Sequence, residues 1–210
     1  MTHYLALPAS GAGPGMLVLH AWWGLNATFR HFCDRLAGEG WVALAPDLYN
    51  GQVATTRESA MQLMRQMDKG AARKALNTAV KDLAAHPAVN RRTIGVVGFS
   101  MGAYYALGLA CQKPRSISAV VNFYGTGRGK FAEAQAAFLG HFAEQDEFEP
   151  LADVRQLEET IRQAGKTVAF HIYPHTRHWF FEPDRPEYDP AAAQLAWERT
   201  AAFLHEEMMR

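Results

Sequence analysis

Cysteine is scarce in this sequence of 210 residues, and charge of either sign is not in excess. The two cysteines, Cys33 and Cys111, cannot build a disulfide framework, and both fall in segments that we expect to be helical, where cysteine usually acts as a small apolar residue. The 21 basic and 21 acidic residues balance. This balance gives no electrostatic reason to expect nucleic acid or an anionic membrane as a partner.

Long apolar runs are also missing. The first residues, Met1–Leu5, lack a basic region followed by an apolar core, and no uninterrupted apolar run approaches about 18 residues. We therefore expect a cytoplasmic protein that acts on small molecules as a monomer or small homo-oligomer. Because 49% of the residues are hydrophobic, the chain is able to bury a substantial core, and we expect one domain over residues 1–210.

Short apolar runs alternate along the chain with segments whose apolar residues recur at helical spacing. Such alternation predicts an α/β fold, with a mostly parallel sheet and helices on both faces. The expected strands are residues 3–7, 16–20, 41–45, 93–97, 117–121, 136–140 and 168–172, and the expected helices are 27–37, 56–67, 70–86, 101–111, 151–164 and 190–208.

A Gly-x-Ser-x-Gly pentapeptide, Gly98–Gly102, lies between an expected strand and an expected helix. A serine on such a sharp turn presents its hydroxyl at the top of the sheet, because glycine on either side lets the backbone pass closely. The pentapeptide alone also occurs in ordinary turns, but strand, turn and helix in succession are more specific. We therefore expect Ser100 to be a catalytic nucleophile.

A serine nucleophile needs a histidine to accept its proton and an acid to orient that histidine. In this type of fold the order along the chain is serine, acid, histidine. The acidic loop after the strand at 136–140 offers Asp146, which we favour, although Glu144, Glu147 and Glu149 are alternatives and an acidic loop is usually only a solvated one. The loop after the last strand offers His175 and His178, and spacing alone leaves both open.

The oxyanion hole needs two backbone N–H groups that point at the developing negative charge. Met101, directly after Ser100, is expected to supply one N–H group. The other is expected from Trp22, in the loop that follows an early strand. Core packing is the commoner role of adjacent tryptophans such as Trp22 and Trp23, and a backbone N–H is able to act whatever its side chain contacts.

Several separated motifs occur along the chain in a recognisable order. They are residues 18–26, 45–49, 95–102, Asp146 with Pro150, 178–181, 188–193 and 196–200. With these motifs the chain resembles the dienelactone hydrolase family of α/β-hydrolases, nearly from end to end. The resemblance implies a triad of Ser100, Asp146 and His178, an α/β-hydrolase fold, and cleavage of small ester or lactone substrates through an acyl-enzyme.

The chain departs from the dienelactone-cleaving members that it resembles, which carry cysteine at position 100 and glutamate at position 21, where this sequence has Ser100 and Ala21. A serine has no accessible anionic resting state, so a second carboxylate beside it would help little and would add charge to an apolar site. Losing both residues together is chemically coherent and indicates an ordinary histidine-activated serine mechanism.

The resemblance also bears on the substrate. In the dienelactone hydrolases that the chain resembles, arginines bind the carboxylate of the substrate. Arg57 matches one of these arginines, and Glu182 stands at the position of another. We therefore expect Glu182 to repel a dicarboxylate. The chain should therefore cleave simple aryl or short acyl esters better than dienelactone. An exposed helical arginine is the alternative interpretation of Arg57. Expected aromatic pocket residues, which favour neutral apolar groups, are Trp22, Trp23, Phe99, Tyr124, Trp179 and Phe180.

Two other functions share the same motifs. Some cofactor-free perhydrolases resemble α/β-hydrolases and use the same triad, and a non-catalytic binding protein can retain the fold. No cofactor is expected, because residues 125–130 lack the spacing of a phosphate-binding loop, and His175 with His178 is too weak a pattern to predict a metal.

Overall fold

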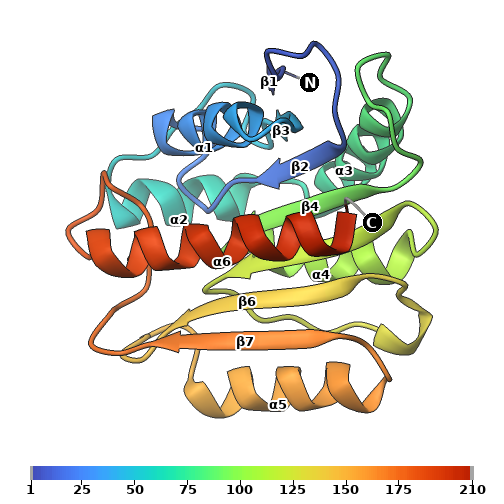
Figure 1. The fold of residues 1–210 in the computed structure, drawn as a ribbon. Helices are drawn as coiled ribbons and strands as arrows, with labels where there is room; N and C mark the ends of the chain where they lie inside the picture. Colours follow the sequence, from blue (N-terminus) through green and yellow to red (C-terminus); the bar gives the residue numbers. More distant parts are fainter. Residues whose placement is uncertain (1, 209–210) are drawn as a thin grey trace.

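The computed structural model describes residues 2–208 and has a seven-stranded sheet at its centre, in the order β1-β3-β2-β4-β5-β6-β7 (Figure 1). Strand β1 pairs antiparallel with β3 at one edge, and every other neighbouring pair is parallel. The strands are β1 (His3–Ala6), β2 (Gly15–Leu19), β3 (Val42–Pro46), β4 (Ile94–Phe99), β5 (Ile117–Phe123), β6 (Ala137–Ala143) and β7 (Val168–Tyr173).

Helices cover both faces of this sheet, and Figure 1 shows α6 crossing in front of it. Helices α1 and α6 pack on one face, and α3, α4 and α5 pack on the other. The prediction of a mostly parallel sheet with helices on both faces is confirmed. The helices are α1 (Ala27–Gly38), α2 (Arg57–Gln66), α3 (Lys69–Ala84), α4 (Met101–Gln112), α5 (Leu151–Gln163) and α6 (Pro190–Met208), with a 3₁₀ turn, η1, at Phe131–Glu133.

The apolar runs of the sequence form the central strands of the sheet, and helices cover both faces of these strands. Every residue of β2, β3, β4 and β6 is buried, whereas β7, at the sheet edge, has only one fully buried residue. Side chains cap the first turns of two helices. Asn26 accepts a hydrogen bond from the Phe29 N–H at the start of α1, and Asp68 accepts hydrogen bonds from the N–H groups of Gly70 and Ala71 at the start of α3.

Parallel pairing brings the carboxyl ends of β2 to β7 to one edge of the sheet. The loops that follow β2, β4, β6 and β7 carry Trp22, Ser100, Asp146 and His178 respectively. Residues that are far apart in the sequence therefore meet at one edge.

Candidate active site

Ser100 occupies the sharp turn between β4 and α4, with φ at 50° and ψ at −112°. A residue other than glycine rarely adopts a positive φ, and such strain persists only where the surroundings enforce it. A Cβ added to Gly98 would lie 2.5 Å from the carbonyl oxygen of Gly102, and one added to Gly102 would collide with the backbone of Leu19. Both glycines are therefore required for the turn that exposes the serine hydroxyl.

The Ser100 side chain is joined to two other side chains by consecutive hydrogen bonds. His178 Nε2 lies 2.9 Å from Ser100 Oγ, and His178 Nδ1 lies 2.7 Å from Asp146 Oδ2. The side chains of His178 and Asp146 are only 3% and 1% exposed. An ionised carboxylate only accepts, so Nδ1 carries the proton in the neutral ring and Nε2 is free to accept the proton of the serine hydroxyl.

Asp146 is held by its own loop. Its Oδ1 accepts hydrogen bonds from the backbone N–H of Phe148 at 2.8 Å and of Glu149 at 3.1 Å, which leaves Oδ2 directed at His178. The rings of Tyr124 and Phe148 each lie 4.9 Å from the His178 ring. The loop and these rings together restrict the orientation of the imidazole.

In the part of the chain that the structure describes, the other histidine and the other acids that the sequence left open are not hydrogen-bonded to Ser100 or to His178. His175 has a side chain that is 88% exposed, and its nearest carboxylate is Glu144 rather than Asp146. Glu144 is itself exposed, and Glu147 pairs with Arg57 at 2.9 Å. Glu149 lines the same cavity as Ser100, and burial raises its pKa, but its carboxyl group is hydrogen-bonded to Thr126. The structure brings together Ser100, His178 and Asp146.

Two residues that line the cavity of Ser100 have backbone N–H groups without a hydrogen-bond acceptor among residues 2–208. One is Met101, the first residue of α4, and the other is Trp22, in the loop after β2. Both residues line the same cavity as Ser100. They are the two donors that the sequence indicated for an oxyanion hole.

The cavity has a volume of about 580 Å³, and Ser100, Met101 and His178 open into it. Aromatic side chains form one wall: Trp22 stacks on Trp179 at 5.8 Å, and Phe148 packs edge-on against Trp22 at 5.9 Å. The other lining residues are Met64, Arg65, Met67, Lys69, Arg73, Tyr104, Tyr105 and Glu149.

The structure corrects most of the predicted substrate-binding residues. Trp23, Phe99, Tyr124 and Phe180 are at most 2% exposed and belong to the apolar core, not to the cavity wall. Trp23, Phe99 and Phe180 are sequence neighbours of site residues, but their side chains are packed in the core. Of the predicted set, Trp22 and Trp179 line the cavity.

Arg57 does not line this cavity. Its guanidinium pairs with Glu147 at 2.9 Å and Glu187 at 3.2 Å, and it lies 4.8 Å from the Trp179 ring. Its charge is therefore compensated on the protein surface. This placement agrees with the interpretation of Arg57 as an exposed helical residue.

The expectation that Glu182 repels a dicarboxylate is wrong, because its side chain is fully buried. Tyr124 donates its hydroxyl proton to Glu182 Oε1 at 2.8 Å, and Oε2 has no hydrogen-bond partner. Burial raises the pKa of Glu182 to about 8, although the hydrogen bond from Tyr124 lowers it. The carboxyl is therefore protonated at neutral pH and does not face the cavity.

Sequence reasoning missed the contribution of α2 and α3 to the site. Met64 and Arg65 reach the cavity from α2, Lys69 and Arg73 reach it from α3, and Met67 reaches it from the turn between the two helices. Arg65, Lys69 and Arg73 have no carboxylate partner in the described chain, in contrast to Arg57. Phe148 also lines the cavity and was not predicted to do so. Its position two residues after Asp146, in the same loop, could have indicated this role.

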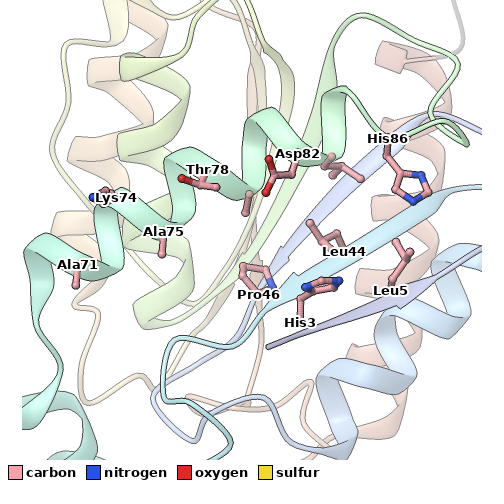
Figure 2. A pocket seen from close by; sticks show the side chains of 12 residues that line it. His3, Leu5, Leu44, Pro46, Ala71, Lys74, Ala75, Thr78, Asp82 and His86 are labelled. Carbon is pink, nitrogen blue, oxygen red and sulfur yellow. The ribbon is translucent and has the colours of Figure 1, made fainter. Parts of the chain in front are cut away.

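A second cavity, of about 560 Å³, lies between α3 and strands β1 and β3, as Figure 2 shows. Leu5, Leu44 and Pro46 form its apolar wall on the side of the strands. Lys74 and Asp82 of α3, with His86 just after this helix, line the opposite side. None of the residues of the serine site lines it. Among residues 2–208, no cluster of three metal-ligating side chains occurs, and no helix has the length and hydropathy to cross a bilayer.

A sequence model of the dienelactone hydrolase family matches residues 1–208. The chain belongs to the dienelactone hydrolase family. Protein usf of Aquifex pyrophilus is 34% identical over 213 residues, which cover 97% of this chain and 92% of that protein. The carboxymethylenebutenolidase of Pseudomonas putida is 30% identical over 210 residues, which cover 94% and 87%. A candidate dienelactone hydrolase structure from Klebsiella pneumoniae has a TM-score of 0.85 at 25% identity, covering 97% and 92%.

Membership of the dienelactone hydrolase family confirms the resemblance and makes the chain a carboxylic ester hydrolase. The α/β-hydrolase fold of the family agrees with the sheet and helix arrangement described above. A small-molecule ester or lactone is the substrate class that follows.

Proposed function

We propose that this dienelactone hydrolase relative cleaves small carboxylic esters or lactones through an acyl-enzyme on Ser100. The observation that carries the proposal is the continuous hydrogen-bonded series Ser100–His178–Asp146, with heavy-atom distances of 2.9 Å and 2.7 Å. A serine hydroxyl is a poor nucleophile by itself, and a neutral imidazole within hydrogen-bond reach is the group that activates it.

In the first half-reaction, Ser100 Oγ attacks the substrate carbonyl carbon while His178 Nε2 takes the hydroxyl proton. Asp146 holds Nδ1–H and stabilises the imidazolium that forms. The negative charge on the former carbonyl oxygen is met by the N–H groups of Met101 and Trp22. His178 then gives its proton to the leaving alkoxide, and a water molecule, activated in the same way, hydrolyses the acyl-enzyme.

Ala21 supports a serine mechanism without a second activating carboxylate. Its side chain is fully buried within the apolar cluster of α1, α6 and the aromatic residues below the site. A glutamate there would need a charge partner, because an unpaired buried carboxylate is strongly destabilised. The aromatic wall of Trp22, Phe148 and Trp179 suits an apolar acyl or aryl group of the substrate.

The test is steady-state hydrolysis of a short p-nitrophenyl ester by the parent protein and by Ser100→Ala, with phosphonate labelling followed by intact mass. We expect kcat to fall by about 10³- to 10⁶-fold in Ser100→Ala, and one phosphonate adduct per chain at Ser100 in the parent. A parent protein with neither turnover nor an adduct would favour the non-catalytic binding protein. Peroxide-dependent halogenation in acetate that exceeded ester hydrolysis would favour the perhydrolase.

A further inference from the structure

His20 is a buried histidine that takes no part in the proton transfers proposed above. It directly follows β2, and its side chain is 0% exposed. Its Nδ1 lies 2.6 Å from the carbonyl oxygen of Ala21, and its Nε2 lies 3.1 Å from the backbone nitrogen of Leu48. A backbone N–H only donates and a carbonyl only accepts, so these partners require one neutral tautomer, with the proton on Nδ1.

The surroundings hold the ring in that state. Burial lowers the pKa of His20, although the Ala21 carbonyl and the charge of Asp47 act in the opposite direction. Asp47 accepts a hydrogen bond from the Tyr49 N–H at 2.9 Å and so orders the turn that supplies the Leu48 N–H. The Tyr49 ring lies 5.3 Å from the imidazole. Both hydrogen bonds of His20 are therefore made from a neutral, packed ring.

The carbonyl that His20 holds shares a peptide unit with the N–H of Trp22. In a planar trans peptide the C=O and the N–H point in opposite directions, and no cis peptide occurs in residues 2–208. The Ala21 carbonyl also accepts a hydrogen bond from the Gly24 N–H at 3.2 Å. The Trp22 N–H consequently points away from His20 and Gly24 and has no acceptor in the described chain.

We propose that His20 is a positioning residue of the oxyanion hole, because its Nδ1–H fixes the Ala21–Trp22 peptide so that the Trp22 N–H faces the oxyanion formed at Ser100. This inference rests on the proposed serine mechanism. A flip of the peptide would present the Ala21 carbonyl oxygen in place of the Trp22 N–H, and would exchange attraction of the oxyanion for repulsion.

Two substitutions separate the two hydrogen bonds of the ring. In His20→Asn, the side-chain amide lies where Nδ1 lay and is able to donate to the Ala21 carbonyl. In His20→Gln, the longer side chain places its amide near the former Nε2, where it accepts from Leu48 and leaves the Ala21 carbonyl without its histidine donor. Losing one oxyanion donor typically lowers kcat by about 10²- to 10³-fold.

The experiment measures kcat and KM for p-nitrophenyl butyrate, the rate of phosphonate labelling, and the melting temperature of both variants. We expect His20→Gln to lose about 10²-fold in kcat with KM within about threefold of the parent value. His20→Asn should recover at least about tenfold of that loss, and labelling rates should follow kcat. A merely structural histidine would give no such split between kcat and KM.

A second buried histidine provides the control. His141 is 0% exposed, and its ring nitrogens lie 2.8 Å from Tyr173 Oη and 3.0 Å from Thr200 Oγ1. His141→Asn and His141→Gln should change kcat only in proportion to the folded fraction. Equal kcat losses in the two His20 variants, with the parent active, would refute the role of His20 alone. A parent that neither turns over nor labels at Ser100 would refute the proposed mechanism and this role together.

Discussion

The buried carboxyl of Glu182 should make the stability of the protein fall as the pH rises. Burial raises the pKa of Glu182 from its ordinary value of 4.5 to about 8. Below pH 4.5 the group is protonated in both folded and unfolded chains. Between pH 4.5 and 8 the unfolded chain releases a proton that the folded chain retains, so the free energy of unfolding decreases through this window and levels off above it.

The size of the effect follows from the two pKa values. Each pH unit of difference between them corresponds to about 1.4 kcal/mol, so the window from 4.5 to about 8 corresponds to about 5 kcal/mol. Glu182→Gln retains an oxygen that accepts the hydrogen bond of Tyr124 and does not titrate. The stability of the variant relative to the parent should therefore rise by about 5 kcal/mol from well below pH 4.5 to well above pH 8, of which about 4 kcal/mol falls between these two pH values.

The assay is urea denaturation of the parent and of Glu182→Gln at several pH values from 4.5 to 9. Comparing the two proteins removes the contribution of all other titrating groups. Glu39→Gln, which removes an exposed carboxylate at the end of α1, is the matched control for the loss of a carboxyl group. A difference between Glu182→Gln and the parent that stays constant within about 1 kcal/mol across this range would refute the reasoning.

Three further predictions concern the serine site. Asp146→Asn should lower kcat by about 10³- to 10⁴-fold with an unchanged circular dichroism spectrum, because an amide favours the wrong imidazole tautomer; a loss below tenfold would contradict this role. Gly102→Ala should destabilise the fold by more than about 3 kcal/mol in urea, because the new Cβ collides with backbone atoms. Gly38→Ala, where a Cβ meets nothing within 4 Å, should be neutral or stabilising, and equal effects would disprove the steric argument. Ser100→Cys combined with Ala21→Glu should not raise turnover of the enzyme's own substrate; an increase would overturn the histidine-activated serine mechanism.

The sequence predicted which side chains meet at Ser100 better than it predicted the residues that line the cavity. Ser100 was recognisable because its strand, glycines and helix are contiguous, and these local features are sufficient to form the turn. Asp146 and His178 followed from chain order and from the resemblance to the family, and spacing alone left His175 open. The exposed position of His175 and the buried position of His178 depend on how the loop after β7 packs.

The direction of individual side chains could not be predicted in the same way. Phe99 and Tyr124 are adjacent to site loops, yet they point into the aromatic core, where the Phe99 ring stacks on Phe123 at 4.6 Å. Glu182 was expected to face a substrate and instead forms a buried hydrogen bond with Tyr124. Neighbouring residues of one loop can differ in this way: Trp22 lines the cavity, whereas Trp23 is packed in the core. The periodicity of the sequence does not predict which of the two faces the cavity.

By itself, the amino-acid sequence determined the succession of strands and helices, the sharp turn at Ser100 and the family, because apolar periodicity, glycine pairs and ordered motifs are properties of neighbouring residues. Only the tertiary structure decided which helices line the cavity, that Glu182 is buried, and that the buried His20 ring contacts the Ala21 carbonyl oxygen. These properties depend on contacts between segments that lie far apart in the sequence, 58 residues for Tyr124 and Glu182 and 78 for Ser100 and His178, and on the packing that removes each group from water.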